Sequence, residues 1–411
     1  MLRRREYLNQ LIKWRDEKII KVVTGIRRCG KSTLLSLFAD YLKEGGVSDS
    51  QIVFVNFEDL ETEELQDYKK LYQYLKERIL PMQTTYIFLD EIQMVGNFEK
   101  VVDSLYLKEN VDMYITGSNA YLLSGELSTL LSGRYVSINM LPLSFAEFYE
   151  IRKRGNPEES FSDYIKIGAF PYVASLPDAE EKASAYLEGV YNTIIVKDIE
   201  DREKRRRPDP NSRKITDITL LQNIARFLAA SVGNQISIKS VADYITSSGR
   251  RVSQNTVADY IRALVEPYVF YPVERFDISG KMLLKTNQKI YISDLGLRNY
   301  LVPKRGHDLG FVTENIVYLE LKRRGFNVNI GKMGNSEVDF VAEKRGRYRY
   351  IQVAASMTEE STFNREIAPL RSIRDNYPKM ILTLDRLTPG NYDGIEVRNV
   401  IDWLLTPQTL S

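Results

Sequence analysis

Runs of five or six mostly apolar residues recur through the first third of the chain and alternate with stretches of helical spacing. Continuous apolar runs of this length are typical of strands that are buried on both faces. Strands that alternate with helices predict a parallel sheet in an α/β domain. The expected strands are residues 19–24, 85–89, 111–116 and 135–140, and residues 33–38 follow a helical pattern.

The pattern changes after residue 140. Residues 141–200 repeat apolar positions at helical spacing, with a break at 168–171. Residues 215–295 predict three helices and a two-stranded ribbon, and Ser253 is the expected cap of the third helix. The domains expected from these changes are 1–145, a helical lid or linker region at 146–214, 215–300, and 301–411.

The last of these domains combines a helix with several strands. The helix contains Glu314 and ends at Gly325, a residue type that suits the end of a helix. Strands are expected after it at 326–330, 336–341 and 348–354. This order predicts a second α/β domain at the end of the chain.

Composition narrows the class of protein. A chain of 411 residues is long enough for about two to four domains. A formal net charge of +2 produces no global field towards nucleic acid or membrane. No apolar run approaches the roughly 18 residues of a membrane span, and the N-terminus lacks the apolar stretch of a signal peptide. With a single cysteine, Cys29, these features predict a cytoplasmic protein that has no membrane partner.

A glycine-rich segment between the first expected strand and the first expected helix matches the pattern GxxxxGK[ST]. Its glycines allow successive N–H groups to face a phosphate, and the helix N-terminus adds partial positive charge there. Lys31 is expected to reach the β- and γ-phosphates of ATP, and Ser32 to bind Mg²⁺. The candidate nucleotide-binding residues are Gly25, Ile26, Arg27, Arg28, Cys29, Gly30, Lys31, Ser32 and Thr33.

Polar residues follow the next two expected strands. Asp90 and Glu91 come directly after residues 85–89, where a carboxylate is needed as a further partner of Mg²⁺ bound to ATP. We assign that role to Asp90, and we expect Glu91 to polarise the attacking water. Ser118 and Asn119 follow residues 111–116, where one of them is expected to contact the γ-phosphate or the water.

Arg134 lies directly before the strand expected at 135–140. An arginine in this position can stabilise the charge of a transferring phosphoryl group, in its own subunit or in a neighbour's. A surface arginine that closes a turn is the alternative. Cys29 leaves two options as well, a reactive thiol near a helix N-terminus or a small group that fills a gap.

Two segments further along are candidates for contact with DNA. Lys204–Arg207 is a basic run, for which a solvated linker is the alternative to phosphate contact. The polar residues around Ser253 are placed to contact phosphates or base edges. They are Arg250, Arg251, Gln254, Asn255 and Thr256. Acidic residues nearby, Asp243, Asp259 and Glu266, dilute the basic character, so protein docking is the alternative role.

These motifs resemble known families. Residues 1–145 resemble the AAA+ group of P-loop ATPases, which implies an ATP hydrolase with Mg²⁺ as cofactor. In that resemblance Lys31, Ser32, Asp90 and Glu91 form the two Walker motifs, Ser118 or Asn119 is the sensor, and Arg134 is the arginine finger. Members of the group often form homo-oligomers. No second-sensor arginine is found beyond Met140.

The later domains also carry resemblances. Residues 215–300 resemble a winged helix, with 253–264 as the recognition-like helix. Residues 301–411 resemble the PD-(D/E)xK nuclease fold, in which two acids and a lysine hold Mg²⁺ and activate water. Gln352 and Ala354 stand where that pattern has its second acid and its lysine, so only Glu314, Glu337 and Asp339 remain.

The whole chain is similar to a broad prokaryotic family that joins these three parts, an AAA-type ATPase, a winged helix and a degenerate nuclease-like domain of unknown function. An ATP-driven switch or DNA-associated motor, whose C-terminal domains recognise a partner, is the favoured hypothesis. Two alternatives stay open. One is an ATP-gated, metal-dependent nuclease, and the other is a signalling scaffold that holds nucleotide with negligible turnover.

Overall fold

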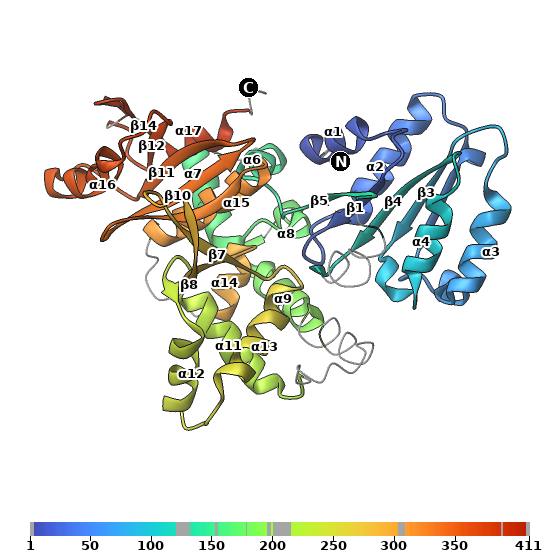
Figure 1. Ribbon diagram of the computed structural model, residues 1–411, viewed down its shortest axis with the longest axis horizontal. Helices are drawn as coiled ribbons and strands as arrows, with labels where there is room; N and C mark the ends of the chain where they lie inside the picture. Colours follow the sequence, from blue (N-terminus) through green and yellow to red (C-terminus); the bar gives the residue numbers. More distant parts are fainter. Residues whose placement is uncertain are drawn as a thin grey trace. The chain divides into compact units, whose positions relative to one another are not determined.

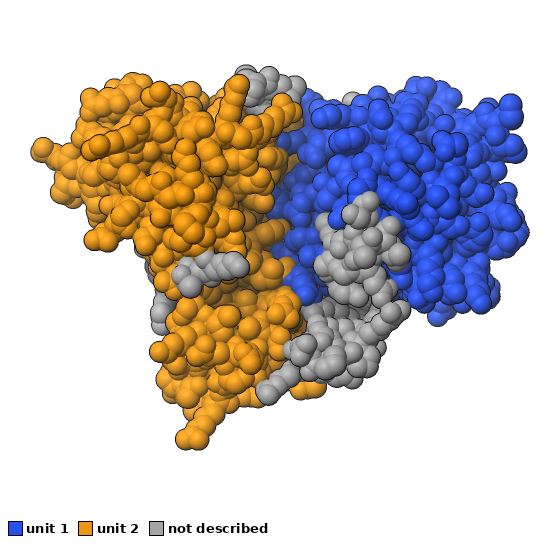
Figure 2. Space-filling model, viewed as in Figure 1, with its two compact units in different colours: residues 1–142, 266–268 blue, residues 143–265, 269–411 orange. Residues whose placement is uncertain are grey.

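The computed structural model describes residues 4–120, 131, 133–152, 155–177, 179–194, 199, 215–302, 309–387 and 389–407. It contains two compact units (Figure 2). The first comprises residues 1–142 with 266–268, and the second comprises 143–265 with 269–411. The main segment of the first unit ends at 142, close to the boundary expected at 145, which stays a prediction. The boundaries expected at 214 and 300 lie inside the second unit and remain predictions.

A five-stranded parallel sheet forms the centre of the first unit (Figure 1). Its strands lie in the order β2-β3-β4-β1-β5. They are β1 (Ile20–Thr24), β2 (Ile52–Asn56), β3 (Thr85–Asp90), β4 (Val111–Gly117) and β5 (Tyr135–Asn139). The helices are α1 (Arg5–Lys13), α2 (Lys31–Glu44), α3 (Tyr68–Arg78) and α4 (Phe98–Tyr106), with short 3₁₀ turns at Asp49–Gln51, Leu60–Gln66 and Ile92–Met94.

Helices cover both faces of this sheet, which is why its central strands are mostly apolar and are buried along almost their whole length. All six residues of β3 are buried. On one face, Leu71 of α3 and Val102 of α4 pack with Ile87 and Leu89. On the other face, Phe38 of α2 lies 4.9 Å from the Tyr114 ring, centroid to centroid. The four strands expected from the apolar runs are thus confirmed.

The second unit contains a nine-stranded mixed sheet in the order β13-β14-β12-β11-β10-β9-β7-β8-β6. The strands are β6 (Gln235–Ile236), β7 (Phe270–Asp277), β8 (Met282–Ile292), β9 (Asn327–Met333), β10 (Ser336–Lys344), β11 (Arg347–Ala354), β12 (Lys379–Thr383), β13 (Gly390–Tyr392) and β14 (Ile395–Asn399). The ribbon β7–β8 joins the rest of the sheet because β7 pairs with β9. The domains expected at 215–300 and 301–411 therefore share one sheet.

Helices of the second unit agree with the expected pattern. They are α6 (Phe145–Arg152), α7 (Pro157–Ile167), α8 (Pro171–Ser175), α9 (Ala179–Asn192), α11 (Ile218–Ala230), α12 (Ile238–Ser247), α13 (Gln254–Val265), α14 (Leu295–Leu301), α15 (Leu309–Arg323), α16 (Glu360–Ser372) and α17 (Val400–Leu405). The expected break at 168–171 separates α7 from α8. Ser253 caps α13, since its hydroxyl accepts a hydrogen bond from the Thr256 N–H at 3.1 Å. Within the described ranges, no helix combines the length and the apolar composition of a membrane span.

Candidate nucleotide-binding site

The glycine-rich segment joins the end of β1 to the start of α2, as its sequence predicts. Gly25 has φ of 151°, and a Cβ at this position would lie 2.1 Å from the carbonyl oxygen of Met140. Gly30, the N-cap of α2, has φ of 102°. Only glycine adopts both conformations without strain. The segment, residues 25–30, thus forms a tight phosphate loop at the carboxyl end of β1, and Ser32 and Thr33 are exposed behind it.

Lys31 is buried beside this loop and faces the acidic residues at the end of β3. Its Nζ lies 3.3 Å from Glu91 Oε1 and donates a hydrogen bond to the Gly25 carbonyl at 3.2 Å. Burial opposes the charged form of Lys31, but the carboxylates of Glu91 and Asp90 outweigh it and raise its pKa. The loop therefore holds a fixed positive charge where an anion is expected to bind.

Asp90 lies at the end of β3, and a residue of the neighbouring strand β4 holds its side chain in place by a hydrogen bond. The Thr116 hydroxyl donates to Asp90 Oδ1 at 2.5 Å and accepts from the Glu91 N–H at 2.9 Å. Asp90 Oδ2 is buried and makes no hydrogen bond within the part of the chain that the structure describes. Burial raises the pKa of Asp90, against the nearby Ser32 and Thr116 hydroxyls, which favour the charged form. The Ser32 hydroxyl and the buried Oδ2 of Asp90 are oxygen ligands of the kind that a Mg²⁺ ion prefers.

Glu91 is held in an uncommon backbone conformation, with φ of 55°. Its carboxylate accepts a hydrogen bond from the Gln93 side-chain amide, which also lies 3.5 Å from the Ser118 hydroxyl. Burial opposes ionisation of Glu91, but Lys31 and then Gln93 outweigh it and lower its pKa. Glu91 is therefore a charged carboxylate with a defined orientation. Ser118 is buried beside it, and Asn119 is only partly buried at the same strand end.

A buried arginine braces the phosphate loop, which the sequence analysis did not single out. The Arg4 guanidinium donates to the Cys29 carbonyl at 3.1 Å and to the Leu141 carbonyl at 2.7 Å. Cys29 itself is fully buried, and burial raises the pKa of its thiol. A protonated, enclosed thiol is unreactive. Of the two options for Cys29, the structure therefore supports gap filling.

Arg134 precedes the start of β5, at the opposite end of the parallel strands from the loop. Its carbonyl accepts a hydrogen bond from the Ile20 N–H at the start of β1, whereas the loop follows Thr24 at the end. At about 3.3 Å a residue, the strand places the two sites roughly 16 Å apart. The guanidinium donates to Asp103 at 2.6 Å instead. Arg134 therefore lies at the far end of the strands from the loop of its own chain, and its role in catalysis stays a prediction.

In the second unit, the three acids expected near a metal lie together, but around a lysine. Glu314 of α15 and Glu337 and Asp339 of β10 surround Lys289 of β8. Gln352 does not face them as a ligand: its carbonyl oxygen accepts from the Asp339 N–H at 3.2 Å. Among the described residues, no group of His, Cys, Asp and Glu forms a metal site. Sequence analysis gave Lys289 no role, because it follows the polar residues Thr286, Asn287 and Gln288 and nothing in the pattern marks it as buried.

The segments proposed for DNA contact are only partly described. Lys204–Arg207 lies outside the described residues. Arg250 is exposed and pairs with Asp217 of the α11 N-cap, which lowers the pKa of Asp217. Arg251, Gln254 and Asn255 are also exposed. This surface is therefore open to a partner, with part of its positive charge already neutralised.

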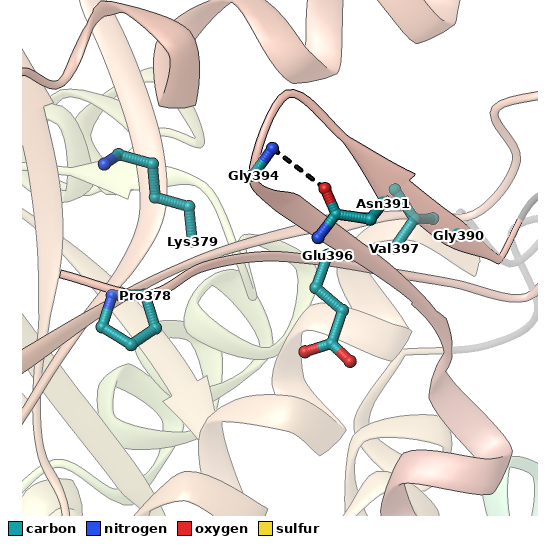
Figure 3. Close-up of a pocket in the computed structure, with 7 residues that line it drawn as sticks. All are labelled: Pro378, Lys379, Gly390, Asn391, Gly394, Glu396 and Val397. Atoms are coloured by element: carbon teal, nitrogen blue, oxygen red, sulfur yellow. Dashed lines mark hydrogen bonds between the residues drawn. The ribbon is translucent and has the colours of Figure 1, made fainter. Parts of the chain in front are cut away.

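A hollow of about 420 Å³ lies at the β13–β14 hairpin, far along the sequence from any expected site residue (Figure 3). It is lined by Pro378, Lys379, Gly390, Asn391, Gly394, Glu396 and Val397. The Asn391 side chain accepts a hydrogen bond from the Gly394 N–H at 2.9 Å and so closes the hairpin turn. The Asn391 side chain is thus used within the hairpin itself, and we assign no function to the hollow.

Comparison with known proteins supports the fold of the first unit. The family model "AAA domain" matches residues 17–149, and "Domain of unknown function (DUF8612)" matches residues 158–308. An uncharacterized protein of Haemophilus influenzae is 38% identical over 410 residues, covering 98% of this chain and 99% of that protein. This chain belongs to the same family.

Two more distant similarities agree with this family assignment and with the fold of the first unit. An uncharacterized protein of Methanocaldococcus jannaschii, MJ1544, is 29% identical over 380 residues, covering 87% of this chain and 79% of that protein. The Walker-type ATPase paby2304 of Pyrococcus abyssi aligns with a TM-score of 0.51 at 15% identity, covering 73% of this chain and 96% of that one. The family therefore has an AAA-type P-loop ATPase fold at its N-terminal end. The winged helix and the nuclease-like fold stay predictions.

Proposed function

We propose that this protein binds ATP with Mg²⁺ at the phosphate loop and hydrolyses the ATP. The observation that supports this most strongly is that three charged side chains lie close together, one at the start of α2 and two at the end of β3. Lys31 at the start of α2 lies 3.3 Å from Glu91, and Asp90 beside it keeps a buried oxygen without a hydrogen bond among the described residues. One cation and two acids at a glycine loop suit a triphosphate and its metal.

Each residue has a distinct role in this proposal. The loop and the N-terminus of α2 bind the phosphates, and Lys31 neutralises the β/γ charge. Ser32 and Asp90 would hold Mg²⁺, which supplies charge neutralisation at the phosphate oxygens when it is bound. Thr116 fixes Asp90 by its hydrogen bond at 2.5 Å.

We assign the activation of the attacking water to Glu91. A charged carboxylate accepts a hydrogen bond from water and so polarises it, and its lowered pKa keeps Glu91 charged at neutral pH. Gln93 orients the carboxylate, and Ser118 or Asn119 contacts the γ-phosphate or the water. Phosphate release at saturating Mg-ATP tests this function, whereas co-purified nucleotide with no release would instead support a signalling scaffold with negligible turnover.

The second unit is proposed to recognise a partner while ATP turnover in the first acts as a switch or a DNA-associated motor. The exposed polar surface at the start of α13 is the candidate for DNA, and the C-terminal strands are the candidate for a protein partner. The C-terminal part is proposed not to cut nucleic acid. The Gln352 side chain is a neutral amide that accepts a hydrogen bond from the Asp339 backbone N–H, and the Ala354 side chain is a methyl group. The second acid and the lysine of a nuclease site are therefore missing.

We predict that Arg134 acts in the site of a neighbouring chain, since the strand register places it at the far end of β1 from the loop of its own chain. Turnover per chain should then rise with protein concentration. Mixing Arg134→Ala with Lys31→Ala should restore part of the activity, because one chain contributes an intact loop and the other an intact arginine. The control mixture is Glu91→Gln with Lys31→Ala, which leaves no intact site and should stay inactive. A rate independent of concentration, with no rescue, would show that Arg134 has no such role.

DNA contact at the start of α13 predicts a strong dependence on salt, because phosphate contacts release counterions. Replacing Arg250 and Arg251 with alanine should weaken binding and flatten the slope of affinity against salt concentration. Arg371 and Arg374 provide a matched control, since both are exposed and Arg371 pairs with Asp393 as Arg250 pairs with Asp217. If neither duplex nor single strands shift in low-salt gels, this surface is a protein-docking or spacer module.

A further inference from the structure

A lysine is buried among three carboxylates in the second unit. The Lys289 ammonium lies 2.8 Å from Glu314 Oε1, 2.8 Å from Glu337 Oε1 and 3.5 Å from Asp339 Oδ1. The Lys289 side chain is 5% exposed, and those of Glu314 and Asp339 are 6% and 11% exposed. Charged groups are rarely buried to this degree unless they are paired, so we treat these four residues as one unit, the lysine cluster.

The fold gathers the lysine cluster from three separate elements. Lys289 belongs to β8, Glu314 to α15, and the other two acids to β10. Two strands, β9 and β7, separate β10 from β8 in the sheet order. The pairing of β10 with β9 is irregular between Val338 and Val341, directly at Asp339. The pairing of β7 with β9 covers only Arg275–Asp277, whereas Lys289 pairs with Val273, beyond that stretch. The end of β8 that carries Lys289 is therefore not held at its place in the sheet order by a β7–β9 ladder.

Neighbouring groups hold the carboxylates in place. The Tyr291 hydroxyl donates to Glu314 Oε1 at 2.5 Å, and the Val353 N–H donates to Asp339 Oδ2 at 2.9 Å. The Gln235 side chain donates to Glu337. These donors fix the carboxylates from outside, which leaves Lys289 as the cation at their centre.

The same three acids are the oxygen ligands that a divalent cation prefers. A divalent ion needs oxygens at about 2.0–2.6 Å, which requires the space between them that the Lys289 Nζ fills at 2.8 Å. An ammonium group and a metal ion cannot occupy this space together. Carboxylates that lie this close together repel one another, so the cluster requires either the ammonium group or a metal ion between them.

We infer that the Lys289 ammonium is the resident cation of this cluster and takes the place of a divalent metal ion. The wild-type protein then binds no divalent ion there. Removal of the lysine charge opens a metal site built from Glu314, Glu337 and Asp339. This inference is independent of the nucleotide site, which lies in the other unit. It adds a physical reason for the proposed lack of nuclease activity, because the position that a hydrolytic metal would need is already filled.

Mn²⁺ binding to the full-length protein without nucleotide tests the inference, with the paramagnetic resonance signal of unbound Mn²⁺ as the readout. Lys289→Met, which keeps the length of the side chain and removes its charge, should bind one more Mn²⁺ per chain than the wild type. Adding Asp339→Asn to that variant should remove the extra ion. The inference is overturned if the wild type already binds an ion that Asp339→Asn abolishes, or if folded Lys289→Met gains none.

Two buried acids and the partly exposed Glu337 can prevent folding when their cation is absent, so Lys289→Gln serves as a second variant that retains hydrogen-bond donors. Its melting temperature should rise with added Mn²⁺ by several degrees more than that of the wild type. Lys289→Gln with Asp339→Asn should lose this difference. Equal shifts in all three proteins would show that the ion binds elsewhere and would refute the inference.

Discussion

Replacing Lys31 with alanine is expected to abolish ATP binding at working nucleotide concentrations. The variant removes the buried ammonium that faces the β/γ-phosphates, and truncating one partner of a buried charge pair costs about 2–5 kcal/mol, or roughly 30-fold or more in affinity. It also leaves the Glu91 carboxylate without the cation 3.3 Å away, so a repulsive charge remains where the phosphates should bind. Equilibrium dialysis with labelled ATP measures the loss.

Lys43→Ala is the matched control for this variant. Lys43 lies on the same helix, but it is half-exposed near the other end and pairs with Asp49 at 2.6 Å. Its removal should leave ATP affinity unchanged within about twofold, since surface ion pairs contribute little. An equal loss in both variants would mean that α2 is destabilised as a whole, and the assignment of Lys31 would fail.

The second large effect is expected from Glu91→Gln, which should bind ATP but hydrolyse it roughly tenfold or more slowly. Glutamine keeps the shape of the side chain, so the phosphate loop and the buried environment of Lys31 remain. It cannot polarise water as a charged carboxylate does. The kinetic signature is a lower kcat with a KM that does not rise, measured by phosphate release at saturating Mg-ATP.

Glu64→Gln is a suitable control for this result, because Glu64 is an exposed acid whose carboxylate pairs only with Lys70 at 3.1 Å among the described salt bridges. Its turnover should equal that of the wild type. Should Glu91→Gln keep full turnover as well, water activation belongs to another group, and the role of Glu91 is confined to its pair with Lys31.

The phosphate loop could be predicted from sequence because its signal is local. Glycines, lysine and serine stand within eight residues, and the flanking strand and helix are recognisable from their own periodicity. The same holds for Asp90 and Glu91, which follow a continuous apolar run. Their positions at a strand tip depend on one segment of chain only.

Contacts between distant segments could not be predicted in this way. The bond from Thr116 to Asp90 depends on the neighbouring positions of β3 and β4, and the brace from Arg4 to Leu141 spans almost the whole first unit. The distance between Arg134 and the loop follows only from the register of β5 on β1. Strand order is a property of the packed sheet, and no periodicity along the chain encodes it directly.

The lysine cluster illustrates the same limit at the other end of the chain. Glu314, Glu337 and Asp339 were expected to lie together, but the expected order of helix and strands gave no place to Lys289, which lies before the helix. Since β8 and β10 are not neighbours in the sheet order, the cation that satisfies the acids could be identified only from the structure.

The central claim, that ATP binds at the phosphate loop through Lys31, is tested most directly by calorimetry in the Glu91→Gln background, where hydrolysis does not add heat. Glu91→Gln should bind one Mg-ATP per chain in a saturable titration. Glu91→Gln with Lys31→Ala should bind at least about 30-fold more weakly. Equal affinity in the two proteins would contradict the account, because it would place the triphosphate away from Lys31.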